Sequence, residues 1–210
     1  MIYRDGTIRK YLSDAAAGIP APGGGSVSAL AGALATTMGS MAANFTVGKK
    51  KFAAVEPQAK ELLARLDALR EQLLVLMDED VAAYGVVAAA YGMPKETPGE
   101  KAARSARIQE ALVVAMEAPL RTMRACADVV RAVAALVDVA NPNLLSDAGV
   151  SAALAEAALR GAKLNVDANL ALLKDEALVR RTRDEAAGLA AEAARLLGEV
   201  MGKVTAKMGR

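Results

Sequence analysis

An aspartate within an apolar helical face is the side chain best placed for acid–base chemistry. Residues of this face recur at spacings of three and four, the period of a helix: Leu66, Leu69, Leu73, Met77, Asp80, Tyr84, Val87 and Tyr91. A carboxylate there is costly unless it is paired or functional, and burial raises its pKa toward the range useful for proton transfer. We predict Asp80 as a general base with Tyr84 one turn on; a buried ion pair with Arg or Lys is the alternative. Asp78 and Glu79 are expected to face solvent.

A glycine-rich loop is the second candidate for chemistry. Gly23, Gly24 and Gly25 precede Ser26, which we expect to cap the following helix. Backbone N–H groups at a helix N-terminus suit a carboxylate, a phosphate or a developing oxyanion. The spacing matches neither a P-loop nor a dinucleotide fingerprint. A tight turn that only starts a helix explains the glycines equally well.

Polar residues recur along the helix that follows this loop. Ser28, Thr36, Ser40 and Asn44 are separated by multiples of four residues, so they share a face. Serine and threonine often bond to their own helix or to a neighbouring helix, and we favour that interpretation for the first three. Asn44 is different, because an amide at a buried helix end needs partners, and a ligand can be one.

Further amides and a basic cluster complete the candidates. Asn165 and Asn169 share one face of a later helix, where their poor helix propensity indicates that something holds them. Asn141 and Asn143 are explained by turns and caps. The run from Lys49 to Lys51 is either a solvated loop or a site that attracts an acidic ligand tail.

Other chemistries are excluded or disfavoured by composition. The chain has no histidine, which rules out histidine-based zinc sites and Ser-His-Asp or Cys-His devices, and we expect neither a metal nor a cofactor. Cys126 is the one cysteine, so we expect a buried structural residue and a reducing, cytoplasmic location. A net charge of +2 is too balanced for a nucleic-acid partner.

Six helices must position these residues. The apolar fraction of 54% is rich in alanine, and no segment alternates with period two, which predicts an all-α bundle. Residues 1–210 form one domain without repeats. Several helices are long enough to overhang one subunit, so we predict a homodimer. The expected helices are Thr7–Ala17, Ser26–Gly48, Val55–Tyr91, Pro98–Asp138, Ser146 or Asp147 to Leu173, and Glu176–Lys207.

One segment is long enough to raise the question of a membrane. Ser26 to Val47 has 22 residues without a charge, but Gly, Ala, Ser and Thr dominate it. We expect a helix buried in a soluble bundle, not a membrane span. The start of the chain, from Met1 to Asp5, shows no signal-peptide core.

Six segments, taken in their order along the chain, resemble the cyclodeaminase/cyclohydrolase family. The likeness covers nearly the whole chain, and Ala35, Phe45 and Ala140 depart from the expected pattern, which bears on local packing. The segments that carry it are Pro22–Leu34, Asn44–Phe52, Asp80–Tyr84, Arg107–Ala111, Asn143–Val150 and Asn165–Leu170.

The resemblance implies an all-helical homodimer that binds a tetrahydrofolate in a cleft near the glycine loop. It implies one of two reactions: hydration of 5,10-methenyltetrahydrofolate to 10-formyltetrahydrofolate, or attack of N10 on a formimino carbon with loss of ammonia. We favour the cyclohydrolase, because the chain carries no formiminotransferase half and is close in length to the free-standing form. Two alternatives are not enzymes: a folate-binding protein without turnover, and a helical dimer that binds no folate.

The resemblance also suggests roles for the candidates. Asp80 would activate water, Tyr84 would assist it or pack on the pterin, and Lys49 would help to place the water or offset the glutamate tail. The expected substrate-binding residues are Gly23, Gly24, Gly25, Ser26, Ser40, Asn44, Lys50, Asp147, Asn165 and Asn169.

Overall fold

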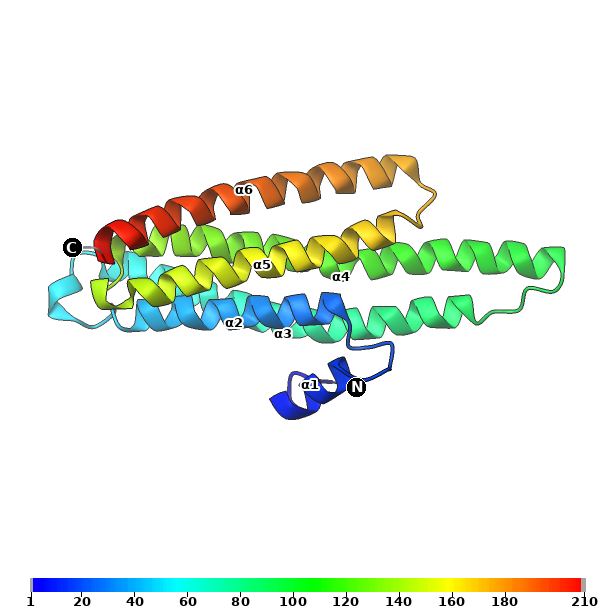
Figure 1. Ribbon diagram of the computed structural model, residues 1–210, viewed down its shortest axis with the longest axis horizontal. Helices are drawn as coiled ribbons and strands as arrows, with labels where there is room; N and C mark the ends of the chain where they lie inside the picture. The colour runs from blue at the N-terminus through cyan, green and yellow to red at the C-terminus, as the bar shows by residue number, and fades with distance from the viewer. Residues whose placement is uncertain (1, 209–210) are drawn as a thin grey trace.

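The computed structural model describes residues 2–208, in which five long α-helices form an elongated bundle and a sixth, short helix lies beside it (Figure 1). No β-strand occurs in this range, so the all-α prediction is confirmed. The elements are α1 (Ile8–Ala15), α2 (Gly24–Asn44), the short 3-10 helix η1 (Lys50–Phe52), α3 (Glu56–Tyr91), α4 (Pro98–Val139), the 3-10 helix η2 (Pro142–Leu144), α5 (Leu145–Leu170) and α6 (Glu176–Met208).

The core lies between α2, α3, α4 and α5. Helix α2 packs against α3 and α5, α4 packs against the same two helices, and α6 covers α4 and α5. Leucine, valine and alanine fill the interior, and Leu66, Leu73 and Met77 of the predicted apolar face are buried. Cys126 is fully buried, and burial raises the pKa of its thiol to about 12, which confirms the structural interpretation.

Helix α1 stands apart from the other five and lies near the beginning of α2 (Figure 1). We define residues 2–22, which include α1, as the N-terminal strap. Ile8, Tyr11 and Leu12 recur at the spacing of one helical face, but only Tyr11 is buried, while Ile8 and Leu12 are 72% and 58% exposed. The strap therefore contacts the bundle through its two tyrosines and through Arg4, whose Nε lies 3.8 Å from Oδ2 of Asp78.

Two predicted helix starts are wrong. Gly23 takes the cap position of α2 in an extended conformation, and Ser26 lies inside the first turn, where its hydroxyl pairs with Tyr11. Helix α5 begins at Leu145, because η2 leads directly into it, and neither Ser146 nor Asp147 caps it. The other long helices begin and end within one residue of the predicted positions.

Helix α2 is long and apolar enough to span a membrane by length and composition alone. Most of it is buried in the bundle, as is typical of a core helix. Large apolar side chains nevertheless remain exposed along its outer side. We call these four residues the α2 stripe: Val27, Leu34, Met41 and Phe45.

Candidate active site

A pocket of about 360 Å³ opens where the N-terminus of α2 meets α3, α4 and α5. Its volume is in the range of small-molecule sites, and apolar side chains with a few polar groups line it, as is usual for such sites. The lining residues are Pro20, Ala21, Gly23, Gly24, Asp80, Tyr84, Val87, Leu112, Ala115, Asn165, Ala168, Asn169 and Leu172.

Asp80 connects the pocket to the beginning of α2. The N–H of Ser26 donates to Oδ2 of Asp80 at 2.9 Å, using one of the first-turn N–H groups that a helix cannot pair internally. Burial raises the pKa of Asp80 above its usual value, and the bond from Ser26 offsets part of that rise. Asp80 has no ion-pair partner among the described residues, so the buried ion pair that the sequence left open is not formed.

Asn165 and Asn169 present acceptors to the pocket. The side-chain amide of Asn165 donates to the carbonyl of Gly161 at 2.9 Å, and that of Asn169 donates to the carbonyl of Asn165 at 2.9 Å. Rotating either amide by 180° would set its oxygen against a carbonyl oxygen, so the amide orientation is determined. Their Oδ1 atoms are thereby left to accept hydrogen bonds from a ligand's N–H groups.

The first turn of α2 approaches these amides closely. A side-chain carbon at Gly24 would lie 3.0 Å from Nδ2 and 3.3 Å from Oδ1 of Asn165. Only a residue without a side chain fits there without moving Asn165. The glycine turn and the asparagine pair therefore form two adjoining walls of one pocket.

Tyr84 lies at the mouth of the pocket, one turn beyond Asp80. It is 43% exposed, which leaves its ring available to a flat ligand. Val87 and Leu112 line the pocket beside it. The predicted helical face is thus buried as far as Met77 and then opens onto the pocket.

Five other predicted site residues lie away from this pocket within one chain. Ser40 is 16 residues beyond Gly24, about 24 Å along α2 at 1.5 Å per residue. Its hydroxyl donates to Asp67, while Ser28 and Thr36 bond to carbonyls of their own helix, as the favoured interpretation predicted. Asn44, Lys49, Lys50 and Asp147 do not line the pocket either; they belong to the segments around the C-terminus of α2, η1 and the first turn of α5.

Asp78 is largely buried, although the sequence predicted that it faces solvent. Its side chain is 12% exposed, and Oδ1 accepts a hydrogen bond from the N–H of Tyr3 at 2.6 Å. The N-terminal strap covers it, which the helical period alone could not reveal. Glu79 is partly exposed and pairs with Arg121 of α4.

Two residues that matter for the site were not singled out from the sequence. Tyr11 pairs with Ser26 behind Asp80, at an Oη–Oγ distance of 2.9 Å. Gln109 of α4 donates to the carbonyl of Leu172 and accepts from the N–H of Lys174, and so fixes the loop that carries Leu172 into the pocket. Two features of the sequence could have pointed to them. Aromatic residues are scarce, which makes Tyr11 notable, and Gln109 lies in Arg107–Ala111, a segment that carries the family resemblance.

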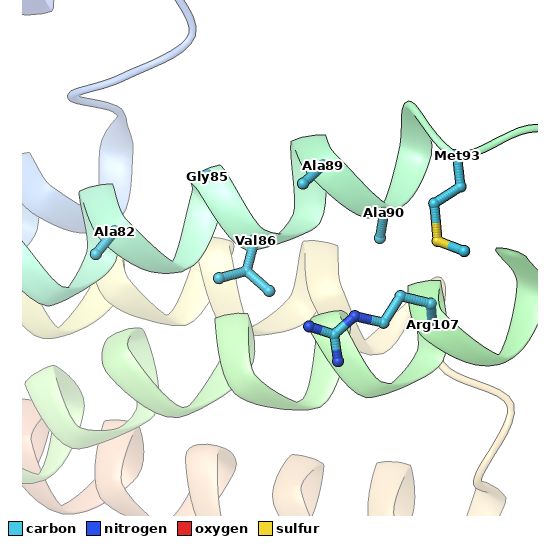
Figure 2. A pocket seen from close by; sticks show the side chains of 7 residues that line it. All are labelled: Ala82, Gly85, Val86, Ala89, Ala90, Met93 and Arg107. Atoms are coloured by element: carbon cyan, nitrogen blue, oxygen red, sulfur yellow. The ribbon is translucent and has the colours of Figure 1, made fainter.

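A second hollow lies on a different side of α3, between its C-terminal part and α4 (Figure 2). It has a volume of about 440 Å³, and Arg107, which bonds to Glu110, is its one charged lining residue. It has neither a carboxylate nor an amide to do chemistry. Among residues 2–208, no group of three or more acidic or cysteine side chains is arranged to hold a metal ion.

Comparison with known proteins identifies the family of the chain. A family model described as formiminotransferase-cyclodeaminase matches residues 7–188. The chain belongs to the formiminotransferase-cyclodeaminase family. Within this family, it is 41% identical over 202 residues to the methenyltetrahydrofolate cyclohydrolase of Methylorubrum extorquens, covering 96% of this chain and 97% of that protein.

Bifunctional relatives and a solved structure belong to the same group. The chain is 31% identical to the formimidoyltransferase-cyclodeaminase of Rattus norvegicus over 97% of its own length, but it spans only 38% of that protein. The crystal structure of formiminotetrahydrofolate cyclodeaminase from Thermotoga maritima superposes with a TM-score of 0.87 at 28% identity, covering 96% of this chain and 97% of that one. The family resemblance predicted from sequence is therefore confirmed.

Proposed function

We propose that the chain is a methenyltetrahydrofolate cyclohydrolase, which adds water to 5,10-methenyltetrahydrofolate and releases 10-formyltetrahydrofolate. The supporting observation is a carboxylate of raised pKa that meets a helix N-terminus inside a pocket of ligand size. The methenyltetrahydrofolate cyclohydrolase of Methylorubrum extorquens is similar over almost its full length, which supports the same assignment.

The reaction needs a base and later an acid. The carbon between N5 and N10 is electrophilic in the methenyl form, because it belongs to an amidinium cation. Asp80 takes a proton from water as the oxygen bonds to that carbon, which becomes tetrahedral. The protonated Asp80 then returns the proton to N5 as the C–N5 bond breaks. The remaining hydroxyl proton passes to water as the C=O bond of the formyl group on N10 forms, so that one proton is released overall. A raised pKa suits both steps, since one group must accept and release the same proton near neutral pH.

The walls of the pocket would orient the substrate for this step. The Oδ1 atoms of Asn165 and Asn169 suit the N–H groups along a pterin edge. Tyr84 is placed to pack on the ring or to assist the base. First-turn N–H groups at Gly24 and Gly25 would favour negative charge that develops on the attacking oxygen.

A cyclodeaminase is the second candidate, favoured by the similarity to the rat and Thermotoga maritima proteins. In that reaction N10 attacks the formimino carbon on N5 and ammonia leaves. Both reactions pass through a tetrahedral carbon that bears N5, N10 and one further heteroatom, so one pocket can serve either.

One assay separates these functions. Purified protein is mixed in turn with methenyl- and formimino-tetrahydrofolate, and the methenyl absorbance and released ammonia are followed. A cyclohydrolase consumes the methenyl absorbance, whereas a cyclodeaminase produces it together with ammonia. No turnover of either compound would refute both enzymatic proposals, and equilibrium dialysis would then test a folate-binding protein without catalysis.

We propose further that the active form is a homodimer built on the α2 stripe. Val27, Leu34, Met41 and Phe45 are between 38% and 50% exposed and share one side of an uncharged helix. A two-fold axis across this side would run two α2 helices antiparallel. The partner's C-terminal end of α2 would then lie near the glycine turn, which brings Asn44, Lys49 and Lys50 of one chain toward the pocket of the other.

We also propose that the protein works in the reducing cytoplasm without a metal, a cofactor, a nucleic acid or a membrane. The net charge of +2 and the single buried cysteine support this. Dialysis against EDTA should leave the turnover rate unchanged.

The homodimer proposal has its own test. A Leu34→Glu substitution should give monomers in light scattering, and a dimer that survives it would refute the proposed interface.

A further inference from the structure

The N-terminal strap attaches to both helices that hold Asp80. On α3, the N–H of Tyr3 donates to Asp78, two residues before Asp80. On α2, Tyr11 pairs with the hydroxyl of Ser26 at 2.9 Å. The strap thus bridges the carboxylate's own helix and the helix turn that donates a hydrogen bond to it.

The two tyrosines of the strap form a matched pair with different partners. Their rings meet edge to face, with centroids 5.3 Å apart, and both residues are at least nine-tenths buried. The hydroxyl of Tyr3 donates to Asp14, which belongs to α1 itself. Only the hydroxyl of Tyr11 leaves the strap to reach the glycine turn.

Ser26 therefore has a contact on each side. Its hydroxyl pairs with Tyr11, and its N–H donates to Oδ2 of Asp80 at 2.9 Å. Ser26 and Tyr11 are 0% and 3% exposed, so water cannot readily replace either partner. A buried hydroxyl that loses its partner carries a desolvation cost, which a shift of the turn that carries Ser26 would relieve.

From this chain of contacts we infer that Tyr11 is a positioning residue for Asp80, acting through Ser26 to hold the first turn of α2 against the carboxylate. Tyr11 does not line the pocket, so a substrate bound there would not touch it. Its hydroxyl fixes the turn, and the turn fixes the direction of the carboxylate. The expected effect of Tyr11 on kcat rests on the proposed function, whereas its expected effect on the position of Asp80 does not.

The first experiment compares Tyr11→Phe with Tyr3→Phe, its matched control. Each variant removes one hydroxyl from the same edge-to-face pair. We expect Tyr11→Phe to lower kcat about 10-fold with KM within about twofold, because a small misplacement of a catalytic group is costly. Tyr3→Phe should keep the wild-type kcat. Equal losses in both variants would overturn the inference, since the strap would then act only as a stabilising element.

The second experiment places Tyr11→Phe in an Asp80→Asn background. If Tyr11 acts through Asp80, the double variant should be no slower than Asp80→Asn alone. A further 10-fold loss in the double variant would show that Tyr11 acts by another route, and the inference would fail while the role of Asp80 stood.

The third experiment measures the pKa of Asp80, which reports on its contact with Ser26 and needs no turnover. Carbon-13 NMR of the labelled carboxyl gives its pKa in the wild type and in both tyrosine variants. Around Asp80 lie Tyr11 of the strap and Ser26 of α2, Tyr84 one turn on along its own helix, and the uncharged Leu112 and Asn165 of α4 and α5. Asp78, two residues earlier, is bound by Tyr3 and Arg4 of the strap. Weakening the Ser26 bond should raise the pKa of Asp80 in Tyr11→Phe and leave it unchanged in Tyr3→Phe.

The two readouts separate the two proposals. A raised pKa in Tyr11→Phe with an unchanged kcat would support the positioning contact and refute Asp80 as the base. An unchanged pKa in Tyr11→Phe would overturn the inference, whatever happens to kcat.

Discussion

A side-chain carbon on Gly25 would lie 2.1 Å from Oδ1 of Asp80 and 2.6 Å from its Cγ. Unbonded atoms do not approach so closely, so the carboxylate and the first turn of α2 fit together only because position 25 has no side chain. Glycine is required at position 25 because of this close approach and not because of a special backbone conformation. The glycine turn therefore sets how near the carboxylate lies to the helix N-terminus.

Gly25→Ala is expected to displace Asp80 and to lower kcat by about 10²-fold, the cost of moving a catalytic group by roughly 1 Å. Gly18→Ala is the control, because a side chain at Gly18, earlier in the same loop, meets no atom within 4 Å. Steady-state kinetics would measure both, with circular dichroism to verify the helix content. Wild-type kcat in Gly25→Ala would show that the carboxylate can move without cost.

Asp80→Asn tests the base directly. Asparagine keeps an oxygen that can accept from the N–H of Ser26, so the fold should survive, but it cannot take a proton from water. We expect kcat to fall by about 10²- to 10⁴-fold, the usual contribution of a general base. Glu71→Gln, which removes an exposed acid of the same helix, should have no effect. Near-full activity in Asp80→Asn would remove Asp80 from the proposed mechanism.

The pH dependence of the wild-type rate should reflect the raised pKa of Asp80. The base acts only when it is deprotonated, so kcat should fall as the pH decreases through the folded pKa. Because burial raises this value, the decline should begin above the ordinary aspartate value of 3.8. A rate that stays constant down to that value would contradict the burial of an active base.

Asp80→Asn is expected to stabilise the protein even as it lowers kcat. A raised pKa means that the fold disfavours the charged carboxylate relative to the unfolded chain. This penalty is complete above the folded pKa and disappears as the pH falls to the unfolded value of 3.8. The melting temperature of the variant should therefore exceed that of the wild type at pH 7, and the gap should narrow on acidification. A lower melting temperature at pH 7 would mean that the bond from Ser26 outweighs burial.

The sequence was sufficient to predict the helices and the face on which Asp80 lies, because both follow from a period of three to four residues. It could not predict the neighbours of that face. Asp78 is two residues away and seemed solvated, yet the N-terminal strap covers it. Ser26 looked like a cap, but its hydroxyl pairs with Tyr11, a contact between segments that no local pattern encodes. Nor could the period show that Lys49 belongs to a different end of the bundle from Asp80.

The separation of Lys49 from Asp80 gives the last prediction, which tests the proposed homodimer. Lys49 follows the C-terminus of α2, while Asp80 adjoins its N-terminus, and the helix has 21 residues. At 1.5 Å per residue these ends are about 30 Å apart. If Lys49 contributes to catalysis, it must therefore reach the pocket of a partner subunit.

Mixing two inactive variants should then restore activity. In a mixed dimer of Asp80→Asn and Lys49→Ala, one site receives both substitutions and the other receives neither. Random reassembly makes half of the dimers mixed, so unfolding and refolding the two variants together should recover about a quarter of the wild-type activity. Each variant refolded alone is the control and should stay inactive. If the mixture stays inactive while both variants form dimers, the partner does not complete the site, and full activity of Lys49→Ala alone would remove Lys49 from the catalytic residues.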